Sequence, residues 1–189
     1  MENTPASPNN TGWVTPAIVL AVVAFALLFA FKATGFGTWY SIFKLVHVSA
    51  AVFWVGGGLL LTALAIRAQR SDNPEELATV ARQAAWVGEK LFAPAGGIVL
   101  AMGIAMTINF HWGWGTTWIT IALVGWAISF VTGIAVLSPR AKRLTTLFDT
   151  VGAAAPETQK AVQEIILIAR VDVAILLLVV LDMVLKPYF

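Results

Sequence analysis

Long apolar runs separated by short polar stretches dominate the chain and predict its elements. Five runs suit helices crossing a hydrocarbon core of about 30 Å, which takes about 20 residues; they lie at about 15–31, 41–66, 91–108, 117–137 and 165–185. Residues 1–13 are polar and rich in Pro and Asn, which is typical of a disordered tail. The pattern predicts an all-α integral membrane bundle of five transmembrane helices, with one transmembrane domain over residues 14–189.

The polar stretch between the second and third runs carries a helix signal of its own. Asp72 or Asn73 can cap a helix start, Pro74 suits its first turn, and the two glutamates that follow suit the positive end of the helix dipole. A modest apolar stripe follows. We therefore expect a short interfacial amphipathic helix that leads, with a bend at Pro94, into the third span.

Small residues recur every four positions in the third and fourth runs, which predicts faces that let spanning helices pack closely. The two stripes are Gly97, Ala101 and Ala105, and Gly125, Ser129 and Gly133. The fourth run stops at Ser138 and Pro139, and a polar connection is expected from there to Pro156.

Composition strengthens the membrane assignment. The chain is 59% hydrophobic and only 12% charged, whereas soluble domains carry about 25% charged residues. A net charge of +2 is too small to indicate a nucleic-acid partner. Because there is no cysteine, disulfides, iron–sulfur clusters and thiolate metal sites are excluded.

The basic residues predict the topology. They gather in the connections after the second and fourth runs: Arg67, Arg70, Arg82 and Lys90, and Arg140, Lys142, Arg143 and Lys160. The connection between the third and fourth runs has none. The positive-inside rule then places the N-terminus in the cytoplasm and the C-terminus outside. His47 becomes an outer-leaflet residue in this orientation.

The main candidate site is a stripe on the second run, where Lys44, His47, Ala51, Trp54 and Gly58 share one helix face. Ionisable groups inside spans are scarce and usually face other helices. The functional interpretation is that His47 is an axial ligand of a haem or another tetrapyrrole, held in a flat slot beside the indole and the glycines. The structural alternative is a histidine that donates to a backbone carbonyl or to Asp182.

The fifth run carries further charges. Asp182 and Lys186 are four residues apart in the favourable order, which predicts an anchoring ion pair. Arg170 and Asp172 lie near the inner end, do not share a face, and favour a transporter if they line a pathway. Ligand sets for copper, zinc or di-iron are lacking, because Met102 and Met106 form the only close methionine pair and fit core packing.

Four stretches in order, KLVHVSAAVFWVGGG, RQAAWVGEKLFAPAG, LSPRAKRL and DMVLKP, resemble an uncharacterised family of bacterial predicted integral membrane proteins, the domain of unknown function twenty-two sixty-nine. Lys44, His47, Trp54 and Gly57 also resemble the pattern of HemJ-type protoporphyrinogen oxidases, and there is a distant likeness to CopD-type copper-resistance membrane domains. The HemJ resemblance implies that His47 binds haem b or another tetrapyrrole. The chain lacks that family's second histidine and its later lysine, so the resemblance implies binding and not the oxidase reaction.

Three functional hypotheses follow from these patterns. The first is a tetrapyrrole-binding membrane protein that uses the His47 stripe. The second is a small-solute or ion transporter or channel, which Arg170, Asp172 and Asp182 favour. The third is a non-catalytic accessory subunit of a membrane complex, which the small-residue stripes and the many tryptophans favour. The lipid bilayer of a bacterial inner membrane is the expected partner, with a second copy or a membrane-complex subunit as further partners.

Overall fold

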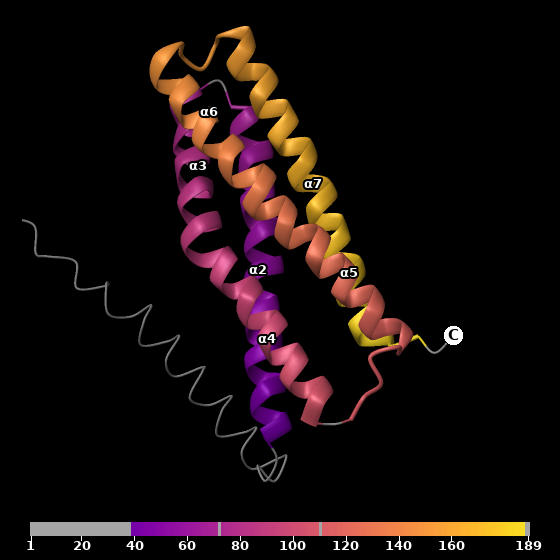
Figure 1. Cartoon of the computed structure of the whole chain (residues 1–189). Helices are drawn as coiled ribbons and strands as arrows, with labels where there is room; N and C mark the ends of the chain where they lie inside the picture. Colours follow the sequence, from indigo (N-terminus) through magenta and orange to yellow (C-terminus); the bar gives the residue numbers. More distant parts are fainter. Residues whose placement is uncertain (1–38, 72, 110, 188–189) are drawn as a thin grey trace, which may run out of the picture. The chain divides into compact units, whose positions relative to one another are not determined.

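Helices account for all the regular structure in a computed structural model that describes residues 39–71, 73–109 and 111–187 (Figure 1). In chain order they are α2 (Trp39–Gln69), α3 (Pro74–Val87), η2 (Gly88–Phe92), α4 (Ala93–Asn109), α5 (Thr117–Val131), η3 (Thr132–Leu137), α6 (Ser138–Thr150) and α7 (Pro156–Leu185). The unit described below runs from Ile42 to Phe189. The predicted tail, the first predicted span at about 15–31 and the domain boundary between them lie outside the described residues.

Three described helices are long and apolar enough to cross a membrane, namely Trp39–Gln69, Pro74–Asn109 and Thr117–Thr150. They contain the runs predicted at about 41–66, 91–108 and 117–137, so these three span candidates are confirmed. At 1.5 Å per residue the 36 residues of the second extend about 54 Å, well beyond a hydrocarbon core of about 30 Å. Helix α7 also contains its predicted run, but it carries Arg170, Asp172 and Asp182 along its apolar length.

The connections before α4 and before α6 are both continuous helix. Asn73 caps α3 as expected, since its Oδ1 accepts the N–H of Glu75 at 3.1 Å. As expected, α3 leads into α4, through the π-helical turn η2. By contrast, α5 runs through η3 into α6, where a polar connection was expected. The stop signal at Ser138 and Pro139 was misleading, because α6 continues the helix and packs on α3.

The elements η2 and η3 are single wide turns of π-helix, and each ends two positions before a proline. The N–H of Ala93 bonds the carbonyl of Gly88 and the N–H of Ser138 bonds that of Gly133, five residues back in both cases. Pro94 and Pro139 come next and have no N–H to give. A proline ring also clashes with the carbonyl four residues before it. The wider turn relieves this conflict, so the helix continues past Pro94, where a bend was predicted, and past Pro139, where the run was predicted to stop.

The elements form four continuous helical segments, namely α2, α3–η2–α4, α5–η3–α6 and α7. Together these segments make up two halves with different side chains. In the ion-paired half, α3, α6, the end of α2 and the start of α7 enclose a small core of Ala68, Leu77, Ala81, Leu144, Val162 and Ile166. In the apolar half, α4, α5 and the remaining parts of α2 and α7 enclose Trp54, Val55, Ala95 and Leu176. Six ion pairs between described residues join side chains of the first half or of η2, which adjoins it.

Helices α5 and α7 lie side by side in the apolar half (Figure 1). Gly125 and Ser129 of α5 are buried, and Val179 of α7 takes the space that a side chain on Gly125 would need. The small-residue stripe predicted on α5 is therefore a close-packing face at these two positions. The stripe predicted on α4 lies one position out of register, because Gly96 is the buried residue while Gly97 borders open space.

Candidate functional site

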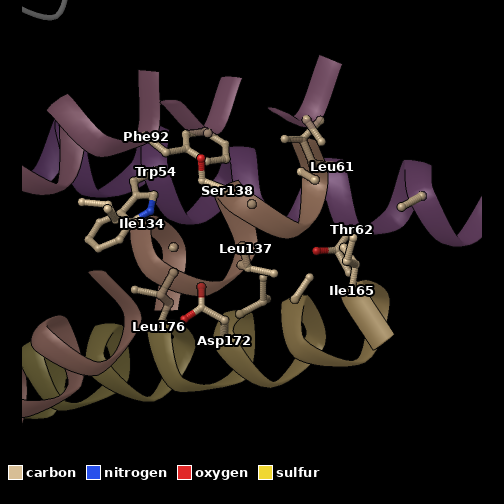
Figure 2. Close-up of a pocket in the computed structure, with 18 of the residues that line it drawn as sticks. Trp54, Leu61, Thr62, Phe92, Ile134, Leu137, Ser138, Ile165, Asp172 and Leu176 are labelled. Carbon is tan, nitrogen blue, oxygen red and sulfur yellow. The ribbon is translucent and has the colours of Figure 1, made fainter. Parts of the chain in front are cut away.

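A cavity of about 160 Å³ lies between the two small cores, at the level of the two π-helical turns. All four helical segments contribute to its wall, and both Gly88 and Gly133 line it with open space where a Cβ would stand. Figure 2 shows Trp54, Phe92, Ile134, Leu137 and Leu176 around it, together with Ser138, Thr62 and Asp172. The wall is thus almost entirely carbon, and about this volume accommodates a single aromatic ring in other apolar protein cavities.

The π-helical turns shape this cavity. Each widens its helix and has a glycine at its first or second position, Gly88 in η2 and Gly133 in η3, so side-chain bulk is missing where these turns face the interior. Such turns are rare and occur frequently at functional sites. The paired prolines and glycines, Gly88 with Pro94 and Gly133 with Pro139, are the sequence signal for the cavity.

Among the described residues that line the cavity, Asp172 alone has an ionisable side chain. It is 8% exposed, and its Oδ1 has no hydrogen-bond partner. Figure 2 shows its carboxyl rising from α7 toward η3. The side chain of Ser129, itself fully buried, lies against it from α5, but its Oγ completes no hydrogen bond either. A carboxyl group in such surroundings is costly unless it is protonated or paired, so it marks a functional site by default.

His47 faces the bundle as predicted, and it takes the structural alternative foreseen for it. Its Nδ1 donates to the carbonyl of Val99 at 2.8 Å, which ties α2 to α4. Gly103 makes this approach possible, since a Cβ there would stand 3.3 Å from the imidazole Cε1. His47 lines none of the cavities described in this section.

The other stripe residues separate from one another. Trp54 is 7% exposed and meets Phe130 edge to face at 6.3 Å between ring centroids, so it belongs to the cavity wall. Gly57 leaves room for Phe92, whose ring would stand 2.6 Å from a Cβ there. Lys44 is exposed and has an interaction of its own. Phe92 fills the space beside this glycine, and none of the three hollows described in this section brings these residues together with His47. Tetrapyrrole binding stays a prediction.

Asp182 and Lys186 do not form the ion pair expected of them. Lys186 ends α7 in the left-handed conformation (φ 45°), which takes it off the helical spacing. Its Nζ lies 5.2 and 5.1 Å from the ring centroids of Trp112 and Trp118, a cation–π arrangement. Both carboxyl oxygens of Asp182 are buried without a hydrogen-bond partner. Sequence reasoning missed this because it assumed that the helix continues through Lys186.

Two further hollows offer fewer groups that could bind a ligand. A cleft of about 350 Å³ between α3 and α6 is lined by charged residues, but these already pair, Arg82 with Asp149 at 3.6 Å and Glu89 with Lys142. An apolar groove of about 330 Å³ runs between α5 and α7. Across residues 39–71, 73–109 and 111–187, no three His, Asp or Glu side chains gather as metal ligands would.

Comparison with known proteins reaches the level of the family. No curated protein and no solved structure matches the chain. The model of one family, described as "Predicted integral membrane protein (DUF2269)", matches residues 41–187. This match extends over α2 to α7 and includes the cavity and His47. The likenesses to HemJ-type and CopD-type proteins stay predictions. The chain belongs to the DUF2269 family and is an integral membrane protein.

Proposed function

We propose that this protein is a small-solute transporter whose binding site is the cavity at the π-helical turns. The observation that carries the proposal is Asp172, a buried carboxyl with an unpartnered oxygen on the wall of an otherwise apolar cavity. A bundle that served only as a scaffold gains nothing from this group, because replacing it by an apolar residue of similar size is commonly neutral or stabilising. The cavity also has the size of a solute with one ring.

The proposed arrangement in the membrane has five spans. They are the span predicted at about residues 15–31, followed by α2, α4, α5 and α7. The two connections that are rich in Arg and Lys both belong to the ion-paired half, so these basic residues lie at one end of the bundle. The positive-inside rule then makes this half cytoplasmic and leaves the apolar half in lipid. The cavity would lie where the two meet, within reach of the cytoplasm.

Filling the cavity tests whether it is a binding site. In Gly133→Leu the new side chain enters open space on the cavity wall, so the helix should stay intact while the solute is excluded. Gly56→Leu is the matched control, because Gly56 also borders open space in a long helix but lines none of the three hollows. The neutral probe is radiolabelled benzyl alcohol, measured by equilibrium dialysis against protein in nanodiscs.

Binding is corrected for partition into protein-free nanodiscs. Saturable binding that Gly133→Leu abolishes and Gly56→Leu retains supports the proposal. Equal binding by wild type and Gly133→Leu, or no saturable binding by wild type, contradicts it.

A further inference from the structure

The chemistry of the cavity wall narrows the class of solute. An ionised Asp172 in a carbon-lined cavity needs a positive charge beside it, and none of the wall residues that the structure describes provides one. Arg170, two positions away on the same helix, is exposed, and the nearest charges of η2 and α6, such as Glu89 and Lys142, are exposed and paired with each other. A compensating charge must therefore be a proton or part of the solute.

A metal ion does not fit this wall. Hard cations take about six or more oxygen ligands, whereas the polar side chains offered here are the Asp172 carboxyl, the hydroxyls of Thr62 and Ser138, and the indole of Trp54. The rest of the wall is apolar and includes the rings of Phe92 and Phe130. Aromatic faces attract organic cations, so the wall is complementary to an ammonium group that carries an apolar body.

Resting on the proposed function, we infer that the solute is a small organic ammonium ion, which replaces a proton on Asp172. Before binding, the carboxyl group holds the proton and the cavity is neutral. The O–H bond breaks as the ammonium ion enters, the proton passes to water, and the carboxylate pairs with the ammonium ion. One proton is released for each cation bound, so charge in the cavity is conserved. Trp54 and Phe92 enclose the apolar body from α2 and η2, opposite α7 (Figure 2).

The experiment compares benzylammonium with benzyl alcohol, which has the same ring and no charge. Both are dialysed against wild type, Asp172→Asn and Asp182→Asn in nanodiscs of zwitterionic lipid. Asp182→Asn is the matched control, because it removes a second buried and unpartnered carboxyl from α7 that does not line the cavity. We expect Asp172→Asn to weaken benzylammonium binding about tenfold or more, since a hydrogen bond to a charged partner is lost. Its affinity for benzyl alcohol should stay within about twofold of wild type.

A second measurement does not depend on how well the variant folds. Wild type in weak buffer should release one proton per benzylammonium bound and none per benzyl alcohol, followed with a pH-sensitive dye. Binding of benzyl alcohol with no preference for benzylammonium, or binding of benzylammonium without proton release, overturns the inference and leaves the proposed site standing. Failure of both probes to bind overturns the proposed function itself.

Discussion

The two halves of the bundle are built from the same helices but are held together by different forces. In the ion-paired half, α3 and α6 present apolar stripes to each other and charged side chains outward, as helices in water do. In the apolar half, the outward side chains are as apolar as the core, for example Val124 and Leu178. The helices of this half are held together by close contacts at glycines and by single hydrogen bonds. Hydrophobic burial contributes little, since lipid is as apolar as the side chains.

This difference explains why the cavity lies where it does. Between the halves, the helices change from one mode of packing to the other, and the π-helical turns η2 and η3 lie at that level. Neither core reaches across, so a hollow remains with Asp172 in its wall. The comparison teaches that the candidate site is a junction between two kinds of packing.

The largest expected contrast comes from one matched truncation in each half. Leu144 and Leu176 are both 4% exposed, in the ion-paired and the apolar half respectively. Leu144→Ala should lower the free energy of unfolding by about 2–5 kcal/mol, from lost transfer and a new void. Leu176→Ala should lower the free energy of unfolding by less. In lipid, the transfer of an apolar side chain contributes little, and Leu176 already borders the cavity. Unfolding in detergent by denaturant measures both, and a larger loss for Leu176→Ala contradicts the division into halves.

Adjacent glycines on α4 test the close packing of the apolar half. A Cβ at Gly96 would stand 2.7 Å from the ring of Phe130 and 3.3 Å from that of Trp54, whereas Gly97 borders open space. Gly96→Ala should destabilise the protein by about 1–3 kcal/mol through overpacking. Gly97→Ala should be neutral or slightly stabilising, as helix propensity favours alanine. Thermal unfolding in detergent separates the two, and equal melting temperatures would show that this helix crossing is looser than described.

Single hydrogen bonds between helices should have smaller effects. The Nε1 of Trp126 donates to the carbonyl of Gly96 at 2.9 Å, which joins α5 to α4. In the wild-type protein, Phe130 stacks on Trp126 at 4.8 Å between ring centroids. Trp126→Phe removes the hydrogen-bond donor and keeps an aromatic ring against Phe130. The expected loss is about 0.6 kcal/mol and at most about 1.7 kcal/mol. His47→Phe, which removes the bond to Val99, should behave alike; a loss several times larger for His47→Phe indicates a further role for the imidazole.

The ion pairs should contribute least. Arg82 bonds Glu75 at 2.6 Å, but the two side chains are 45% and 73% exposed. A double-mutant cycle with Arg82→Ala and Glu75→Ala should give a coupling of about 0.2–1 kcal/mol. That coupling should shrink in 1 M salt, where the screening length is about 3 Å. A salt-independent coupling would mean that this surface is dry and not in contact with water.

Local features of the sequence predicted much of this fold. Apolar length predicted the three span candidates, the side-chain oxygen of Asn73 predicted the start of α3, and the spacing of Gly125 and Ser129 predicted a packing face on α5. These features depend on neighbours in the sequence. The α4 stripe failed because Gly96 and Gly97 are equally small, and only the positions of Phe130 and Trp126 decide which of them is covered.

The candidate site depended on partners distant in sequence. His47 was recognised as inward-facing, but its carbonyl partner Val99 is 52 residues away and cannot be read from spacing. The sequence marks Asp172 as an unusual charge, whereas the hollow beside it forms only where η2 and η3, each with a glycine on the wall, line one cavity.

The sequence by itself determined that this protein is helical and lies in a membrane, because hydrophobic length and hydrogen-bond satisfaction are properties of each segment alone. Only the tertiary structure decided that two prolines sit inside continuous helices, that Lys186 covers tryptophan rings and that Asp172 faces a cavity. The physical reason is that these outcomes follow from which side chains meet across helices, and such contacts exist only once the bundle has packed.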